Sequence, residues 1–130
     1  MKKKGFTLIE LVMVIVILGI LAAMVLPRFI DLQAKAKESA TRGSLGAIRA
    51  AIAVTYASRA AYGESTPVPS SIEATMFQDG QIPVEQMHAS ATNEVVLGTG
   101  NPTGAPGTGG WFYDSVSGKV WLNDSTYSTW

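Results

Sequence analysis

The sequence contains no cysteine and a single histidine, His88. Without cysteine the chain can form no disulfide and can offer no thiolate to a metal ion. One histidine and scattered acids leave no material for a Ser-His-Asp triad or a zinc site, so we expect no enzyme. Lys and Arg total 10 and Asp and Glu total 10, which gives a net charge of zero. This balance gives no indication of a nucleic-acid partner.

What the sequence does contain is one long apolar segment near its start. Between Phe6 and Leu26 only Thr7, Glu10 and Gly19 are not apolar. As a helix this segment would span about 30 Å, the thickness of the hydrocarbon core of a bilayer. Three lysines precede it, and such residues stay in the cytoplasm, so we expect a single span with the N-terminus inside and the rest outside. A removable signal peptide would be shorter and would end in a small-x-small cleavage site.

The start of the chain carries a family resemblance. It resembles the N-terminus of type IV pilins and type II secretion pseudopilins in the order Lys2-Lys3-Lys4-Gly5, then Phe6-Thr7-Leu8-Ile9-Glu10, then an apolar helix with Gly19 and Pro27. The match covers about residues 2 to 60. It implies that a prepilin peptidase cuts between Gly5 and Phe6 and that Phe6 is N-methylated. The aromatic ending GGWFYD…GKVWLN resembles mannose-sensitive-haemagglutinin-type pilins, although many relatives carry cysteines that this chain lacks.

Glu10 is a carboxylate inside the apolar segment. A charged side chain deep in hydrocarbon costs about 2.5 to 3.5 kcal/mol on insertion scales, so it normally has a partner. After cleavage the nearest base would be the new amino group of Phe6, and in a filament Glu10 of one subunit could pair with Phe6 of another. The alternative is local, because Thr7-Leu8-Ile9-Glu10 fits a capping box at a helix N-terminus. The two roles are compatible.

Gly19 and Pro27 mark a weak span in the expected helix. Glycine lowers helix stability by about 1 kcal/mol, and proline removes one amide hydrogen bond and clashes with the preceding turn. The family resemblance implies that this stretch can lose helicity on assembly, which would make it a hinge. The alternative is a static kink at the membrane surface.

Beyond Pro27 the chain is rich in alanine and free of proline as far as Tyr62, so we expect the helix to continue to about that residue. Gly63 then provides a C-terminal stop. Apolar residues recur at helical spacing in its second half and should face the head domain; they are Leu45, Ile48, Ile52 and Tyr56.

The remainder predicts a small head domain. We expect a short helix from Ser71 to about Gln78, a strand at 94–98 and a hairpin at 109–123, with Val120 and Leu122 packed on the helix. The fold class is therefore α+β, a long N-terminal helix on a small antiparallel sheet. The expected divisions are a leader (1–5), a membrane or filament-core helix (6–27), its continuation (28–63) and a globular head (64–130).

Acidic and polar residues near the end of the chain raise the question of calcium. The candidate oxygen ligands are Asp114, Ser117, Asn123 and Asp124. Their spacing is not that of an EF-hand, so we expect ordinary turn residues and no cofactor, with Ca²⁺ as the alternative.

The resemblance therefore implies a structural protein, which we expect to be the major subunit of a type IV pilus-like filament for adhesion, motility or DNA uptake. The resemblance implies as partners further copies of the chain, the prepilin peptidase, and an inner-membrane assembly platform with its ATPase. We expect the chain in the inner membrane before assembly and in an extracellular pilus or periplasmic pseudopilus afterwards. The alternatives are a pseudopilin that drives protein export by type II secretion and a monomeric membrane-anchored binding module.

Overall fold

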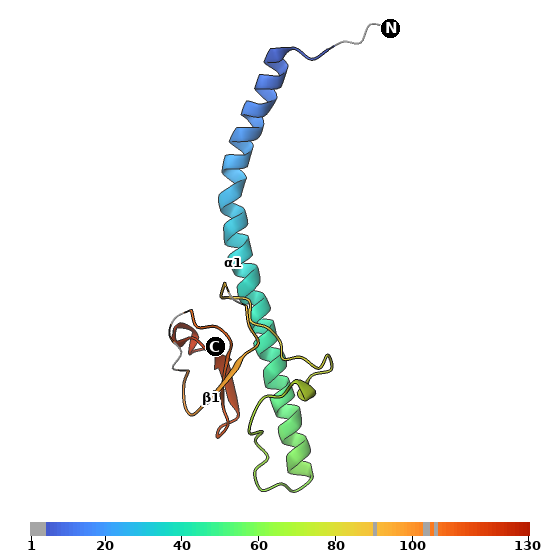
Figure 1. Cartoon of the computed structure of the whole chain (residues 1–130), viewed down its shortest axis with the longest axis vertical. Helices are drawn as coiled ribbons and strands as arrows, with labels where there is room; N and C mark the ends of the chain where they lie inside the picture. The colour runs from blue at the N-terminus through green and yellow to red at the C-terminus, as the bar shows by residue number, and fades with distance from the viewer. Residues whose placement is uncertain (1–4, 90, 103–104, 106) are drawn as a thin grey trace. The chain divides into compact units, whose positions relative to one another are not determined.

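The computed structural model of the chain describes residues 5–89, 91–102, 105 and 107–130. Its elements are helix α1 (Leu8–Ala61), the 3-10 helices η1 (Ala74–Met76) and η2 (Ser125–Tyr127), and strands β1 (Val95–Gly98), β2 (Trp111–Asp114) and β3 (Lys119–Leu122). The chain divides into two compact units, one ending at Ala36 and the other running from Lys37 to Trp130. Helix α1 runs through both units (Figure 1). The lysines of the expected leader, residues 2–4, lie outside the described residues.

Helix α1 is a single element of 54 residues. It ends as expected, because Gly63 adopts a φ of 76°, a left-handed conformation that glycine accepts without strain. The Gly63 amide donates to Ala60 O and the Glu64 amide to Arg59 O, each at 3.1 Å, which closes a Schellman motif. Pro27 lies inside the helix and does not interrupt it. The hinge at Gly19 to Pro27 concerns the assembled state and stays a prediction.

One face of α1 within the second unit forms half of the core. Leu45, Ile48 and Ile52 are buried there, as their spacing predicts. They belong to one apolar cluster with Ile72 and side chains of β2 and β3, among them Trp111, Tyr113, Val120 and Leu122. The fourth residue of the predicted stripe, Tyr56, is 46 % exposed, so that part of the prediction is wrong. Tyr56 does not belong to the apolar cluster that the other three residues form with the sheet.

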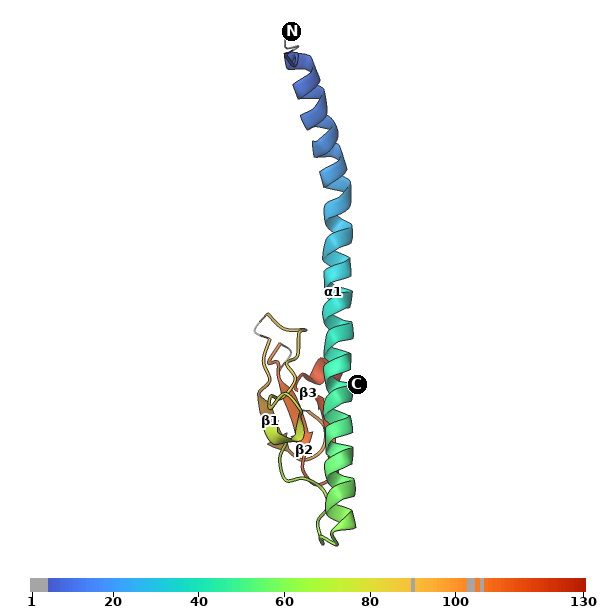
Figure 2. The same cartoon turned by 90° about the vertical axis from the view of Figure 1, so that its right-hand side faces the viewer.

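The sheet has the order β1-β2-β3 and lies along the second half of α1 (Figure 2). Strands β2 and β3 form the expected antiparallel hairpin, with Phe112 opposite Trp121. Strand β1 pairs with β2 in parallel, with Val95 opposite Trp111. The α+β class is confirmed, but the sheet is mixed and not wholly antiparallel. Because β1 and β2 are parallel, β2 begins at the same end of the sheet as β1, which a two-residue hairpin turn cannot achieve.

The connector between α1 and the sheet contains much less helix than expected. In place of a helix from Ser71 to Gln78 it forms only the one-turn η1. Glu73 and Phe77, which flank η1, have extended backbone angles, and the Glu73 side chain makes no cap hydrogen bond. Met76 and Phe77 instead pack against the core. The contact with the core therefore outweighs the weak local preference for helix.

Candidate functional site

The start of α1 brings Thr7 and Glu10 together, directly after Phe6. Gly5 and Phe6 are exposed and precede the helix, so the bond between them is accessible. Glu10 Oε2 accepts hydrogen bonds from the Thr7 amide at 2.8 Å and from Thr7 Oγ1 at 2.7 Å. The Glu10 amide in turn donates to Thr7 Oγ1 at 3.3 Å. Thr7 and Glu10 thus form the capping box, and they fix the carboxylate one helical turn from Phe6.

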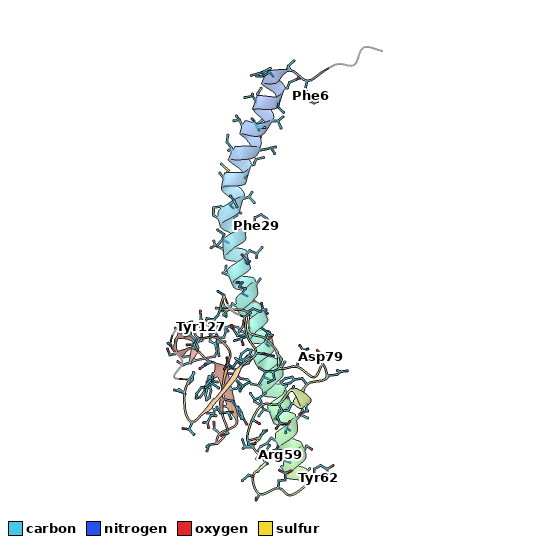
Figure 3. All side chains as sticks on the ribbon, in the orientation of Figure 1. Phe6, Phe29, Arg59, Tyr62, Asp79 and Tyr127 are labelled. Atoms are coloured by element: carbon cyan, nitrogen blue, oxygen red, sulfur yellow. The ribbon has the colours of Figure 1, made fainter. Side chains whose placement is uncertain are left out.

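The first part of α1 is an uncovered apolar surface. Every large apolar side chain from Phe6 to Leu26 is exposed, Phe6 itself by 89 %. The side chains stand out from the helix without being covered, as Phe6 and Phe29 illustrate (Figure 3). The helix is long and apolar enough to cross a membrane, by length and composition. A surface of this kind requires lipid or other apolar helices as its surroundings.

Asp114 and Asp124, the calcium candidates, are both engaged by the protein itself. Asp114 Oδ1 accepts from the amides of Val116 and Ser117, and Oδ2 accepts from Ser117 Oγ at 2.7 Å and from the Gly100 amide at 3.2 Å. The Ser117 hydroxyl and the Val116 amide hold the pKa of Asp114 below its usual value. The Asp114 carboxylate therefore closes the β2–β3 turn, and Ser117 contributes hydrogen-bond donors to the same turn.

Asp124 follows β3 and is 2 % exposed. Its Oδ1 accepts from the Thr126 amide at 2.7 Å, which caps η2, and its Oδ2 accepts from the Gly107 amide at 2.8 Å. Burial disfavours the charged form, but the hydrogen bonds from Gly107, Thr126 and His88 outweigh it and lower the pKa of Asp124 to about 2. Among the described residues no group of three or more His, Asp or Glu side chains is arranged to hold a metal ion.

Asn123 opens the sequence Asn-Asp-Ser, which has the form of a glycosylation sequon. Its side chain is buried, with 3 % of the residue exposed, and Nδ2 lies 3.4 Å from Gly109 O. A glycan at this nitrogen would have no room in the folded head, so Asn123 is a structural residue.

Sequence reasoning missed a cluster in the head. His88, noted only as the single histidine, lies between the carboxylates of Glu85 and Asp124. The Glu-x-x-His spacing places the first pair near each other, but Asp124 is 36 residues away and only the fold brings it close. No local pattern identifies such a partner.

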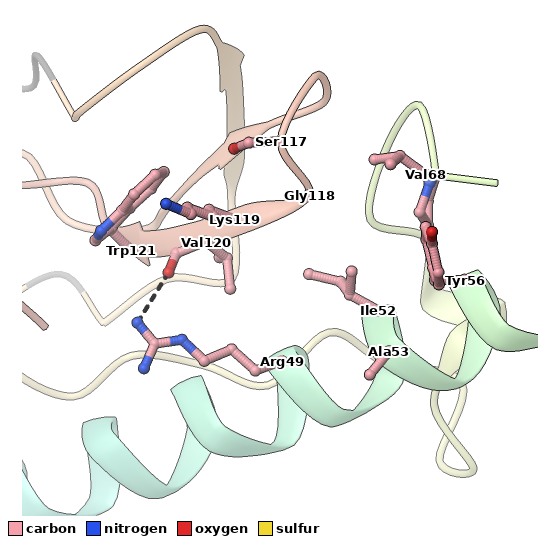
Figure 4. A pocket seen from close by; sticks show the side chains of 11 residues that line it. Arg49, Ile52, Ala53, Tyr56, Val68, Ser117, Gly118, Lys119, Val120 and Trp121 are labelled. Atoms are coloured by element: carbon pink, nitrogen blue, oxygen red, sulfur yellow. Dashed lines mark hydrogen bonds between the residues drawn. The ribbon is translucent and has the colours of Figure 1, made fainter. Parts of the chain in front are cut away.

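A groove of about 610 Å³ opens between the second half of α1 and β3 (Figure 4). Its lining is mostly apolar and includes Ile52 from α1 and Val68 from the connector, with Tyr56 at one end. Arg49 lies at the other end and donates to Val120 O at 3.1 Å and to Trp130 O at 2.6 Å, so this guanidinium holds the C-terminal segment on the helix. The groove contains no aspartate, glutamate or histidine among its lining residues.

Comparison with known proteins identifies the family to which the chain belongs. The model of the prokaryotic N-terminal methylation motif matches residues 1–26. Fimbrial protein EcpC of Eikenella corrodens is 32 % identical over 127 residues, which cover 97 % of this chain and 80 % of that protein. The chain belongs to the type IV pilin and pseudopilin family.

Two further relatives match over the N-terminal helix. The major component PilA5 of a narrow type IV pilus of Thermus thermophilus is 50 % identical over 54 residues, covering 42 % of this chain and 47 % of that protein. The type II secretion system core protein G of Pseudomonas aeruginosa is 47 % identical over 51 residues, covering 39 % and 36 %. The chain spans less than half the length of these two proteins, and no solved structure matches it.

Proposed function

We propose that this chain is the major structural subunit of a type IV pilus-like extracellular filament that serves adhesion, motility or DNA uptake. The observation that carries the proposal is the uncovered apolar surface of α1 between Phe6 and Leu26, with Glu10 as its one carboxylate. In the membrane lipid covers this surface. In a filament the same segments of neighbouring copies would cover one another.

The proposed assembly latch is an ion pair between copies. Cleavage after Gly5 would leave a methylated ammonium on Phe6, and Glu10 of another copy would neutralise it. A buried carboxylate without such a partner is strongly unfavourable, so the pair would set the axial register of the subunits. In the single chain Thr7 donates to Oε2 of Glu10, and this geometry is compatible with a second partner for the exposed carboxylate.

The remaining partners follow from this role. The prepilin peptidase would act on the accessible Gly5-Phe6 bond, with the N-terminus in the cytoplasm and the head outside it. An inner-membrane platform and its ATPase would extract the subunit, since no catalytic role is proposed for the chain itself. The stretch Gly19 to Pro27, helical in the single chain, would act as the hinge on assembly.

A pseudopilin of type II secretion is the second candidate, favoured by the likeness to the Pseudomonas protein. For that role we would propose Ca²⁺ near Asp114 and Asp124. Both carboxylates already accept several hydrogen bonds from the head, and this favours the pilus. A monomeric anchored module would leave Glu10 as a helix cap only.

The test combines mass spectrometry of the mature N-terminus with electron microscopy of fibres sheared from cells. We expect a chain that begins at methylated Phe6 and long fibres composed of it. Glu10→Ala should still be processed and inserted in the membrane but should form no fibres. Asp31→Ala, which removes an exposed acid farther along the same helix, is the matched control and should assemble normally. An intact Met1, or secretion loss without surface fibres, would contradict the proposal.

A further inference from the structure

A row of three titratable side chains crosses the interior of the head. His88 Nδ1 lies 3.1 Å from Glu85 Oε2, and His88 Nε2 lies 3.1 Å from Asp124 Oδ2. Glu85 is 0 % exposed and Asp124 is 2 % exposed. The side chain of His88 between them is 12 % exposed. The imidazole therefore bridges two buried carboxylates with little contact with water.

Both carboxylates are positioned to accept hydrogen bonds. Glu85 Oε2 also accepts from the Met87 amide at 2.9 Å and from the His88 amide at 3.3 Å. Its second oxygen, Oε1, is buried and has no partner among the described residues. The oxygens that face the imidazole, Glu85 Oε2 and Asp124 Oδ2, thus each already accept from backbone amides, Oε2 from Met87 and His88 and Oδ2 from Gly107.

The imidazole must then supply two donors. A neutral histidine has one N–H and one bare nitrogen, whereas the imidazolium donates from both nitrogens. In the neutral form one lone pair would face a buried carboxylate oxygen, and two negative charges would lie in the interior without a cation. Buried charges of this kind are tolerated only when paired. We infer that Glu85, His88 and Asp124 form a proton-operated clasp, closed when His88 is an imidazolium and weakened when it loses its proton.

The clasp joins parts of the head that are distant in sequence. The segment around Glu85 is tied to α1, because Thr41 Oγ1 accepts from the Gln86 amide at 2.9 Å and Ser44 Oγ donates to Val84 O at 3.1 Å. The far end, Asp124, follows β3 and holds the Gly107 amide. Opening the clasp would remove one tie between the connector and the segment after β3, while the hydrogen bond from Trp111 Nε1 to Pro83 O would remain.

The charged groups facing His88 are few. Glu85 faces it from the connector and Asp124 from the segment after β3. The backbone of Gly109 lies against both Glu85 and His88 and is neutral, as are Thr41 and Ser44 on α1. Within the described part of the head no cation other than His88 is paired with either carboxylate. The positive charge of a protonated His88 is therefore what balances the negative charges of Glu85 and Asp124.

The direction of the pH effect follows from these contacts. Histidine is the side chain whose charge ordinarily changes between about pH 5 and 8. Because the proposed clasp is closed when the ring is protonated, it contributes stability at the lower pH and loses it as pH rises. The head should therefore be more resistant to unfolding in mildly acidic than in alkaline solution.

The protonation state can be read directly, because His88 is the only histidine of the chain. The full chain in detergent, labelled with ¹⁵N in the imidazole, would be followed by NMR from pH 5.5 to 9 with Asp124→Asn beside it. We expect signals of two protonated ring nitrogens at pH 6 that persist to higher pH than in the variant. A single protonated nitrogen at pH 6 in the folded wild-type chain would overturn the inference.

A stability measurement tests the same clasp independently. All three tryptophans lie in the head, at positions 111, 121 and 130, so their fluorescence reports its unfolding in the full chain. Between pH 6 and 9 we expect the thermal midpoint of the wild type to fall by about 5 °C. His88→Gln should lose this pH dependence, and Glu94→Gln, which removes an exposed acid, should keep it. A wild-type fall that persists in His88→Gln would contradict the clasp. If that variant does not fold, the NMR result decides.

Discussion

Glu10 and Thr7 bind each other reciprocally at the start of α1. The carboxylate accepts from both the amide and the hydroxyl of Thr7, and Thr7 Oγ1 accepts from the Glu10 amide. The Glu10 side chain therefore has both the capping role and the proposed latch role. Substitutions can distinguish the two roles, because only the latch requires the negative charge.

We predict different outcomes for two substitutions at this turn. Thr7→Ala removes the hydroxyl from the capping box, which costs about 1 kcal/mol of helix stability, but it leaves the charge of Glu10. Glu10→Gln keeps an oxygen that can accept from the Thr7 amide but removes the charge. Fibres sheared from cells should form in the first variant and be lost in the second, with normal processing in both by mass spectrometry. Normal fibres from Glu10→Gln would reduce this residue to a cap.

The packing of α1 on the sheet predicts a second pair of outcomes. Ile48 is 0 % exposed in the core, whereas Val54 on the same helix is 69 % exposed. Ile48→Ala should lower the free energy of unfolding of the head by about 2 to 5 kcal/mol through lost burial and a cavity. Val54→Ala should change it by less than about 0.5 kcal/mol. Urea titration of the full chain in detergent, followed by tryptophan fluorescence, measures both; equal effects would show that α1 is not packed as described.

The helix and its core face could be predicted from the sequence because both depend on local patterns. Leu45, Ile48 and Ile52 repeat at helical spacing, and Gly63 is a local stop. Tyr56 continues the same repeat, yet it lies at the end of a groove and is half exposed. Periodicity identifies the face of a helix that is buried, but it does not say where the covering layer ends.

The sheet shows the same limit of prediction from local sequence patterns. The hairpin of β2 and β3 is set by its own short turn, in which Asp114 binds the amides of Val116 and Ser117. Strand β1 pairs with β2 in parallel, and no residue pattern within the strands reveals this direction. The contact of His88 with Asp124 likewise exists only once β3 is in place. Long-range geometry is therefore the part that the sequence alone did not predict.

Two glycines outside the helix provide a third prediction. Gly110 and Gly80 have φ values of 80° and 65°, so alanine at either position is strained by about 1 to 2 kcal/mol. A Cβ at Gly110 would also lie 2.7 Å from Glu94 O, the carbonyl that accepts from the Trp111 amide, whereas a Cβ at Gly80 would meet nothing within 4 Å. Gly110→Ala should therefore destabilise the head more than Gly80→Ala in the same urea titration. Equal losses would mean that strands β1 and β2 are not joined through this carbonyl.

Acid should weaken the head through Asp124. Its pKa is lowered to about 2 in the folded chain, although burial opposes ionisation, because Gly107, Thr126 and His88 donate to it. An ordinary aspartate in the unfolded chain has a pKa of about 3.9. The folded state therefore gains stability from this group above that value and loses the gain as pH falls through about 2.

The measurement is the thermal midpoint of the full chain in detergent from pH 5 to pH 2. The wild type should lose midpoint temperature in this range, and Asp124→Asn should start lower and lose less, because it has no carboxylate to protonate. Asp79→Asn, which changes an exposed acid of the connector, should follow the wild type. Asp114, whose pKa the Ser117 hydroxyl also holds below its usual value, contributes in the same direction, so the variant at Asp124 should retain part of the slope. An unchanged slope in Asp124→Asn would show that its hydrogen bonds do not favour the charged form.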